Sequence, residues 1–335
     1  MGSQGAEEVI GSRARFYLVL GLLGSSYVIL ILAMLIGDLA FTTPNHLLAS
    51  LRSPEIRYAI KLSLVSCFIT TILSLWVAVP LGYLLARTRF PGHHVVDTIL
   101  DIPIVLPPLV IGLSLLIFFQ TRPGKWIEQM TSQHMGEMLV YGLFPLLAAL
   151  LLGLSLRQSI GLRWFLLTAV GAGVLMVLIR PFPSLVQSLQ DRFGTPITYA
   201  IPSVILAQFA VSCAFAVRTM RITFEQISPR TEQVALTLGC TPSQAFWMVS
   251  LPEAWRGMVT AASIAWARAL GEFGPILVFS GATRMRTEVL STTVFLELSI
   301  GKLEAALAVS LLMVAVAVVV LLIMRFFGLR SGGAI

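Results

Sequence analysis

The sequence predicts an all-α polytopic membrane protein, and two observations lead to this fold class. Hydrophobic residues make up 57% of the chain and charged residues only 12%, whereas a soluble domain is about half apolar and about a quarter charged. The chain also contains long apolar runs, and a helix needs about 20 apolar residues to cross a bilayer. We therefore expect one membrane domain with no soluble domain between its spans.

Apolar runs suited to spanning a membrane number about eight. They lie at approximately 16–37, 58–86, 99–119, 138–156, 164–180, 199–219, 257–281 and 304–327. The first follows Arg13 and Arg15, as the core of a signal peptide would. At about 21 residues it is longer than the roughly 7–15 residues of such a core, so we interpret it as an uncleaved span.

Prolines interrupt several of these runs, namely Pro80, Pro103, Pro107, Pro108, Pro202 and Pro275. A proline inside a membrane helix frees a carbonyl that a neighbouring group or water must satisfy. The prolines either only kink the helices or shape a pathway that opens and closes. Leu106-Pro-Pro-Leu109 is expected to be the most disruptive site.

Arginines close to the ends of the runs indicate the orientation of the chain, because cytoplasmic loops are rich in Lys and Arg. With the N-terminus in the cytoplasm, both termini and the polar segment 220–256 lie inside. The net charge of +7 then reflects basic cytoplasmic loops rather than nucleic-acid binding. We divide the chain into 1–56 (tail, first span and external loop), the membrane domain 57–327 and a C-terminal tail, 328–335.

Signatures of enzymes are missing from the sequence. It has no G-x-x-x-x-G-K-[ST] phosphate loop, no H-E-x-x-H and no G-x-S-x-G, so we expect no ATP hydrolysis by this chain, no catalytic residue and no metal site. Its histidines are scattered among loops, at His46, His93, His94 and His134. Its cysteines, Cys67, Cys213 and Cys240, form no framework and are predicted to be free thiols.

The polar segment 220–256 is predicted to be two short helices joined by a hinge. Gly239 can adopt the left-handed conformation that ends the first helix, Thr241 with Gln244 can form a capping box at the second, and Pro252 is expected to stop it. An apolar surface is predicted from Leu238, Phe246, Trp247, Val249 and Leu251. This helix pair either lies flat on the membrane or inserts into a groove of a partner protein.

Arg268 and Glu272 lie one helical turn apart in the seventh run, where they share a face and can neutralise each other. A charge near mid-membrane costs at least about 3 kcal/mol unless it is paired or hydrated. The pair therefore either lines or gates a polar conduit, or is a structural ion pair. Gly271 and Gly274 beside it allow helices to approach closely.

The polar segment resembles the EAA motif of ABC importer permeases. The resemblance is carried by Gln233-Val-Ala235, by Gly239 after three intervening residues, and by Val249-x-Leu251-Pro252 after nine more. Gln233 stands where the family usually has glutamate, with Glu232 just before it. In that family the motif forms the coupling helix that docks on the ATPase. The resemblance thus assigns coupling to Glu232, Gln233, Ala235, Gly239, Phe246, Trp247, Leu251 and Pro252.

Two further stretches are similar to the molybdate, tungstate and sulfate permeases of this family, namely Ala267–Gly274 and Arg89–Gly92 followed by Ile102–Gly112. The resemblance implies a core of six helices, with 130–185 as an inserted two-helix hairpin. Two inserted spans leave the coupling segment in the cytoplasm. The translocation path or gate is expected at Arg268, Glu272, Gly274, Pro107 and Pro108.

The family picture implies an inner-membrane homodimer of permeases with two ATPase subunits, which carry the ATP and Mg²⁺, and an external oxyanion-binding protein. The permease itself would hold no cofactor and would work by alternating access. Molybdate or tungstate is the expected substrate, and sulfate or thiosulfate is the alternative. A stand-alone secondary transporter would also use broken helices, but it would give no reason for the cytoplasmic segment.

Overall fold

The computed structural model describes residues 3–41, 52–138 and 196–330. Among these residues, four helices are long and apolar enough to cross a membrane, or five spans if one bent helix pair counts as a single crossing. The expected runs 138–156 and 164–180, and most of the inserted hairpin 130–185, fall outside the described residues. Within the described residues, none of the expected membrane-spanning runs forms a strand.

The long helices coincide with expected runs. They are α1 (Ser3–Phe41), α3 (Pro54–Arg87), α10 (Ile201–Gln226) and α16 (Leu303–Arg330). Pro80 lies inside α3 without ending it, and Pro202 lies in the first turn of α10, where its missing N–H is no loss. Pro80 and Pro202 therefore do not interrupt the spans in which they lie.

Leu106-Pro-Pro-Leu109 does break its span, as predicted. Helix α4 (His93–Val105) and helix α5 (Pro108–Gln120) meet at a bend of 111°. Leu106 is extended, with ψ of 140°, because a residue before proline is pushed out of the helical region. Pro108 then starts α5 at a position that needs no N–H.

The expected run 257–281 is not one continuous crossing. Helix α14 (Trp255–Leu270) ends at Gly271, and a π-helix, η3 (Ile276–Ser280), follows Pro275. The apolar pattern alone did not reveal the interruption, because Gly271–Pro275 combines two glycines and a proline with only one charged residue. Glu272 therefore lies just beyond the end of α14 rather than within a helix.

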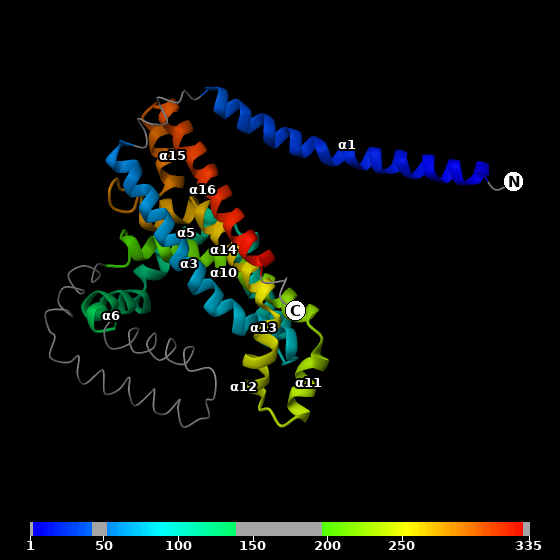
Figure 1. The fold of residues 1–335 in the computed structure, drawn as a ribbon. Helices are drawn as coiled ribbons and strands as arrows, with labels where there is room; N and C mark the ends of the chain where they lie inside the picture. Colours follow the sequence, from blue (N-terminus) through cyan, green and yellow to red (C-terminus); the bar gives the residue numbers. More distant parts are fainter. Residues whose placement is uncertain (1–2, 42–51, 139–195, 331–335) are drawn as a thin grey trace.

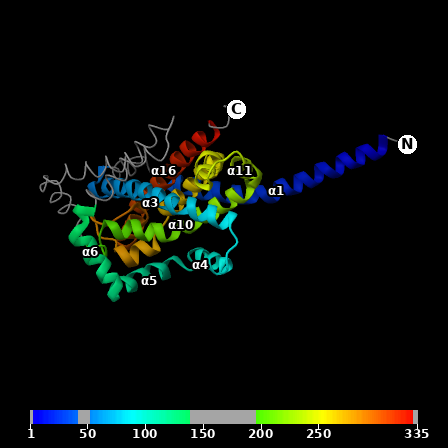
Figure 2. The same ribbon diagram turned by 90° about the horizontal axis from the view of Figure 1, so that it is seen from below.

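Helix α10 forms the centre of the bundle, between α3 on one side and the α4–α5 pair on the other (Figure 2). A stripe of small residues on α3 recurs every fourth position and is buried: Ser66, Thr70, Ser74, Ala78 and Gly82. A Cβ on Gly82 would come within 2.8 Å of the Met220 Cβ on α10, so α3 and α10 pack with their backbones close together.

The remaining described helices complete the two ends of the bundle. Helix α6 (Arg122–Met138) follows α5, and α15 (Leu290–Ser299) packs against α16. Helix α1 projects away from the bundle, and the helical hairpin labelled α11 and α12 extends from the end of the bundle that lies away from α15 (Figure 1). Large apolar side chains such as Phe68 and Trp76 are more than 60% exposed on α3, as expected for a surface that faces lipid.

Candidate functional site

The predicted coupling segment folds as a helical hairpin after α10. Helix α11 (Pro229–Thr237) starts at Ser228, whose side chain accepts a hydrogen bond from the Arg230 N–H, and it ends at Leu238. Gly239 follows with φ of +92°, the left-handed conformation predicted for the hinge. No atom lies within 4 Å of a Cβ built on Gly239, so glycine is needed here for its backbone and not for space.

The second half of the hairpin confirms the predicted capping box. Helix α12 (Pro242–Ala245) begins with Gln244 N–H donating to Thr241 Oγ1 at 3.3 Å, while Thr241 N–H donates to Gln244 Oε1 at 2.8 Å. A π-helix, η2 (Phe246–Ser250), and the short α13 (Leu251–Glu253) continue the helical path.

Pro252 does not stop this helix as predicted, because the helical path runs through it to Glu253. The preceding π turn provides the reason. Leu251 N–H bonds to Phe246 O, five residues back, and this wider turn shifts the register just ahead of the proline that lacks an N–H. The break comes at Ala254, between α13 and α14.

Glu232 faces inward, toward the last turn of α3. Its side chain is 14% exposed, its Oε2 lies 3.3 Å from Arg87 Nε and accepts a hydrogen bond from Ser250 Oγ at 3.2 Å, and its Oε1 accepts one from the Tyr83 hydroxyl. Arg87 also donates from Nη2 to the Ile227 carbonyl at 3.0 Å. We call Tyr83, Arg87, Glu232 and Ser250 the α3 clasp.

Phe246 also belongs to this inner face, not to the apolar outer surface on which it was predicted. Its ring lies 4.6 Å from that of Tyr83, which in turn lies 5.4 Å from Phe224. Ala235 is buried, while Leu251 is half-buried. Phe246 thus packs the hairpin against the bundle.

The outer face of the hairpin is apolar and uncovered. Its large exposed side chains are Val234, Leu236, Leu238, Trp247 and Met248. Leu238 is 80% exposed and Trp247 is 60% exposed. Gln233 and Pro252 are exposed as well. The hairpin thus has two faces, one packed on the bundle and one free to meet another surface.

The predicted path residues come together where α14 ends. Arg268 Nη2 lies 3.5 Å from Glu272 Oε2, and the arginine side chain is 36% exposed while the glutamate is 2% exposed. Arg268 also lies 5.2 Å from the centre of the Phe215 ring, a cation–π contact. Glu272 Oε2 has no hydrogen-bond partner, so the pair is loosely held.

Gly274 lies close to Pro108, which follows Pro107 in the chain. A Cβ on Gly274 would lie 3.0 Å from Leu109 N and 3.3 Å from Pro108, and one on Gly112 would lie 2.6 Å from Pro275 Cα. The start of α5 therefore interlocks with the interrupted stretch after α14. Gly271 was expected to serve the same close approach, but it is exposed, and its nearest neighbour would be 3.7 Å away.

Gln208 is a buried residue at this site that the sequence reasoning missed. Its Nε2 donates to the Ala269 carbonyl at 3.2 Å, and its Oε1 accepts from Thr70 Oγ1 at 3.2 Å. It therefore ties α3 and α10 to the last turn of α14. An amide in the middle of the run 199–219 was the available signal, because such a group must find partners inside a membrane.

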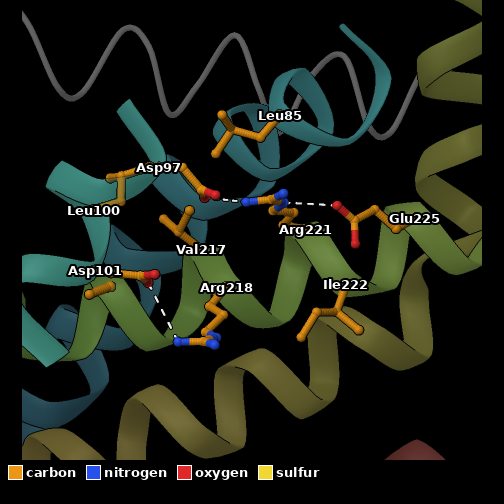
Figure 3. A pocket seen from close by; sticks show the side chains of 10 residues that line it. Leu85, Asp97, Leu100, Asp101, Val217, Arg218, Arg221, Ile222 and Glu225 are labelled. Carbon is orange, nitrogen blue, oxygen red and sulfur yellow. Dashed lines mark hydrogen bonds and ion pairs between the residues drawn. The ribbon is translucent and has the colours of Figure 1, made fainter. Parts of the chain in front are cut away.

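A cavity of about 240 Å³ lies between α4 and the C-terminal half of α10 (Figure 3). Arg221 forms ion pairs with both Asp97 of α4 and Glu225. The distance from Arg221 Nε to Glu225 Oε1 is 2.8 Å. Arg218 lies 3.6 Å from Asp101, and both are well exposed. With three carboxylates and two guanidinium groups, the cavity disfavours a free anion. These pairs instead fasten α4, which buries none of its own residues.

Charged groups also gather near the N-terminal end of α3, outside the membrane-length helices. Arg284 Nη2 binds Glu297 Oε1 at 2.7 Å, which raises the pKa of Arg284. Burial raises the pKa of Glu288, whose Oε1 accepts a hydrogen bond from Thr293. Within residues 3–41, 52–138 and 196–330, His, Cys, Asp and Glu form no group of three that could hold a metal ion. The three cysteines are free thiols, as predicted.

Comparisons with known proteins agree with this arrangement. A family model described as "Binding-protein-dependent transport system inner membrane component" matches residues 78–331. The sulfate transport system permease protein CysT of Escherichia coli (strain K12) is 24% identical over 282 residues, which cover 84% of this chain and 79% of the relative. The molybdenum transport system permease protein ModB of Mycobacterium bovis is 27% identical over 274 residues, 82% of this chain and 80% of the relative.

A solved structure shares the fold. The crystal structure of a bacterial ABC transporter involved in the import of the acidic polysaccharide alginate matches with a TM-score of 0.62 at 18% identity, over 97% of this chain and 99% of that one. At this identity the match supports the fold alone.

Proposed function

Because the chain belongs to the family of binding-protein-dependent transport system inner membrane components, we propose that it carries a tetrahedral oxyanion, molybdate or tungstate, through the membrane by alternating access. It is a multi-pass permease subunit of an ABC importer in the inner membrane and not itself a catalyst. The segment that resembles the EAA motif is the same segment that folds as the α11–α12 hairpin.

The observation that favours an anion is the state of Arg268. Its side chain is 36% exposed and lies 3.5 Å from Oε2 of the buried Glu272, an oxygen that has no hydrogen-bond partner. An unpaired arginine would hold a divalent oxyanion too tightly to release it, whereas one partly neutralised by Glu272 would bind it weakly. The bend at Pro107 and the close contact of Pro108 with Gly274 place a jointed region beside this pair.

Sulfate is the second candidate, and the relatives give the specific reason for it. The Escherichia coli relative is named as a sulfate permease and the Mycobacterium bovis relative as a molybdenum permease, at 24% and 27% identity. These values are too similar to favour one anion. Both anions are tetrahedral and doubly charged, so the same Arg268–Glu272 pair would serve either, and the external binding protein would supply the selection.

The proposed assembly is a homodimer of this permease with two ATPase subunits and an external binding protein. The exposed apolar face around Leu238 and Trp247 supports docking of the ATPase, because a large uncovered apolar patch outside the spans is typical of a partner interface. The N- and C-termini would then be cytoplasmic, and the ATP and Mg²⁺ would be bound by the ATPase.

Reconstitution in vesicles tests the proposal. The permease is combined with its ATPase and binding protein, and ATP-dependent uptake of molybdate, tungstate and sulfate is measured in parallel. We expect uptake of at least one of these anions only when all three components and ATP are present. Uptake driven by an ion gradient without the ATPase would indicate a secondary transporter, and uptake of none of the three would overturn the oxyanion assignment.

A further inference from the structure

We infer that the cytoplasmic end of α3 receives the motion of the coupling segment, and that Tyr83 and Arg87 are positioning residues that transmit it through Glu232. The inference rests on the proposed function and assigns a route within it. The motif itself identifies the docking segment only. It says nothing of which membrane helix the segment moves.

Three parts of the coupling segment, at Ile227, Glu232 and Phe246, converge on one turn of α3. Arg87 binds the Ile227 carbonyl, which precedes α11, and the Glu232 carboxylate within α11. Tyr83 binds the same carboxylate and packs its ring on Phe246 of the π-helix. Tyr83 and Arg87 are one helical turn apart, so a single turn of α3 holds the beginning, the middle and the far arm of the hairpin.

The covalent path from the hairpin to α14 is less direct than this noncovalent contact with α3. Gly239 joins its two arms in the left-handed conformation, and Ala254 separates α13 from α14. A displacement of α11 reaches α14 along the chain only through the Gly239 turn and the break at Ala254. The α3 clasp has no such joint, because Glu232 sits directly on the helix that it would move.

Helix α3 is suited to carry that displacement across the membrane. It is continuous over 34 residues, from Pro54 to Arg87, or about 50 Å at 1.5 Å per residue. Near its other end, the Tyr58 hydroxyl donates to the Arg286 carbonyl at 2.9 Å, and Ser63 Oγ accepts from the Leu290 N–H at 2.8 Å. A movement at the coupling end thus reaches the external loop before α15.

Glu232 is not placed to contact the ATPase itself. Both of its oxygens are engaged within the chain, and only 14% of its side chain is exposed. The neighbouring Gln233 is exposed and remains available for the partner. Removing the charge of Glu232 should therefore leave the outer face intact while loosening the hairpin from α3.

The experiment separates docking from transmission in the complete reconstituted transporter. Glu232→Gln and Arg87→Gln are compared with wild type for ATPase co-purification, ATP hydrolysis and anion uptake. Arg89→Gln is the matched control, because Arg89 is exposed two residues beyond Arg87. We expect both clasp variants to retain the ATPase subunit and to hydrolyse ATP, with uptake per ATP reduced roughly tenfold, the effect of losing one hydrogen bond to a charged group. Arg89→Gln should behave as wild type.

Tyr83→Phe provides a milder variant that keeps the ring packing and removes only the hydroxyl. It should lower uptake per ATP by a smaller factor, and combining it with Glu232→Gln should add little, since both changes remove the same contact. Wild-type uptake per ATP in all clasp variants would overturn the inference. So would loss of ATPase binding in proportion to the loss of uptake, because the clasp would then only shape the docking surface. If wild type itself shows no ATP-driven uptake, the proposed function fails instead.

Discussion

Two arginine–glutamate pairs of this protein have the same chemistry but opposite surroundings. Arg87 and Glu232 are about equally buried, at 13% and 14% exposure, and each makes further hydrogen bonds to other elements. Arg268 is 36% exposed, whereas Glu272 is 2% exposed and its Oε2 has no hydrogen-bond partner. Because Arg87 Nε likewise has no hydrogen-bond partner, the first pair differs from the second in its further hydrogen bonds, which tie it to several elements.

The glycine beside each pair shows the same difference. Gly239, near the first pair, has φ of +92°, which other residues rarely adopt. Gly271, next to Glu272, has φ of −79°, and a Cβ built on it would lie 3.7 Å from the Ala267 carbonyl oxygen. The hairpin therefore depends on a fixed turn, whereas α14 ends without requiring glycine.

Replacing Arg268 should have the largest effect on transport. Arg268→Ala removes the cation from the proposed path, and loss of one charge-assisted hydrogen bond to the anion corresponds to a fall in uptake of roughly 10- to 100-fold. ATPase binding should be unchanged, because the hairpin is untouched. Arg256→Ala is the matched control, since Arg256 is an exposed arginine on the same helix.

Glu272→Gln tests the same ion pair by changing its carboxylate instead of its guanidinium. With the neutralising charge removed, Arg268 should hold the anion longer, so uptake should fall by roughly tenfold while half-saturation shifts to lower anion concentration. Radiolabelled uptake over a range of concentrations measures both quantities. Normal uptake in both Arg268→Ala and Glu272→Gln would remove the pair from the path.

Gly239→Val should have the next largest effect, on coupling rather than on the path. A β-branched side chain at φ of +92° strains the hinge by about 1–2 kcal/mol or more, so uptake per ATP hydrolysed should fall by roughly tenfold while the protein remains in the membrane. Gly239→Asn is the control, because asparagine tolerates this conformation better. Equal behaviour of the two variants would contradict a conformational role for the hinge.

The sequence predicted the local features of the coupling segment well because they depend on neighbouring residues. The left-handed Gly239 and the Thr241–Gln244 box are set by steric and hydrogen-bonding rules within a few positions. The passage of the helix through Pro252 was not predictable in this way. It depends on a π turn, and no simple residue pattern specifies the register of that turn.

Most long-range contacts of the site could not be predicted from the sequence. Arg87, as an arginine at the end of a run, indicated only the orientation of the chain. Its pairing with Glu232 depends on how the intervening helices pack, which the sequence does not specify. The approach of Gly274 to Pro108 was similarly invisible, although each residue was singled out separately. The stripe from Ser66 to Gly82 could have been found, because small residues at every fourth position indicate close helix packing.

A smaller effect, on stability, distinguishes the glycines after α14. Gly274→Ala would place a Cβ 3.0 Å from Leu109 N and force the start of α5 away, which should lower the free energy of unfolding by about 1–3 kcal/mol, as overpacking typically does. Gly271→Ala would meet nothing closer than 3.7 Å and should leave the stability unchanged. Thermal unfolding of the detergent-solubilised protein, measured with both variants at the same pH, checks the difference. If Gly271→Ala destabilised the protein as much as Gly274→Ala, the interruption of α14 would be a rigid joint, and the contrast with the hairpin would be lost.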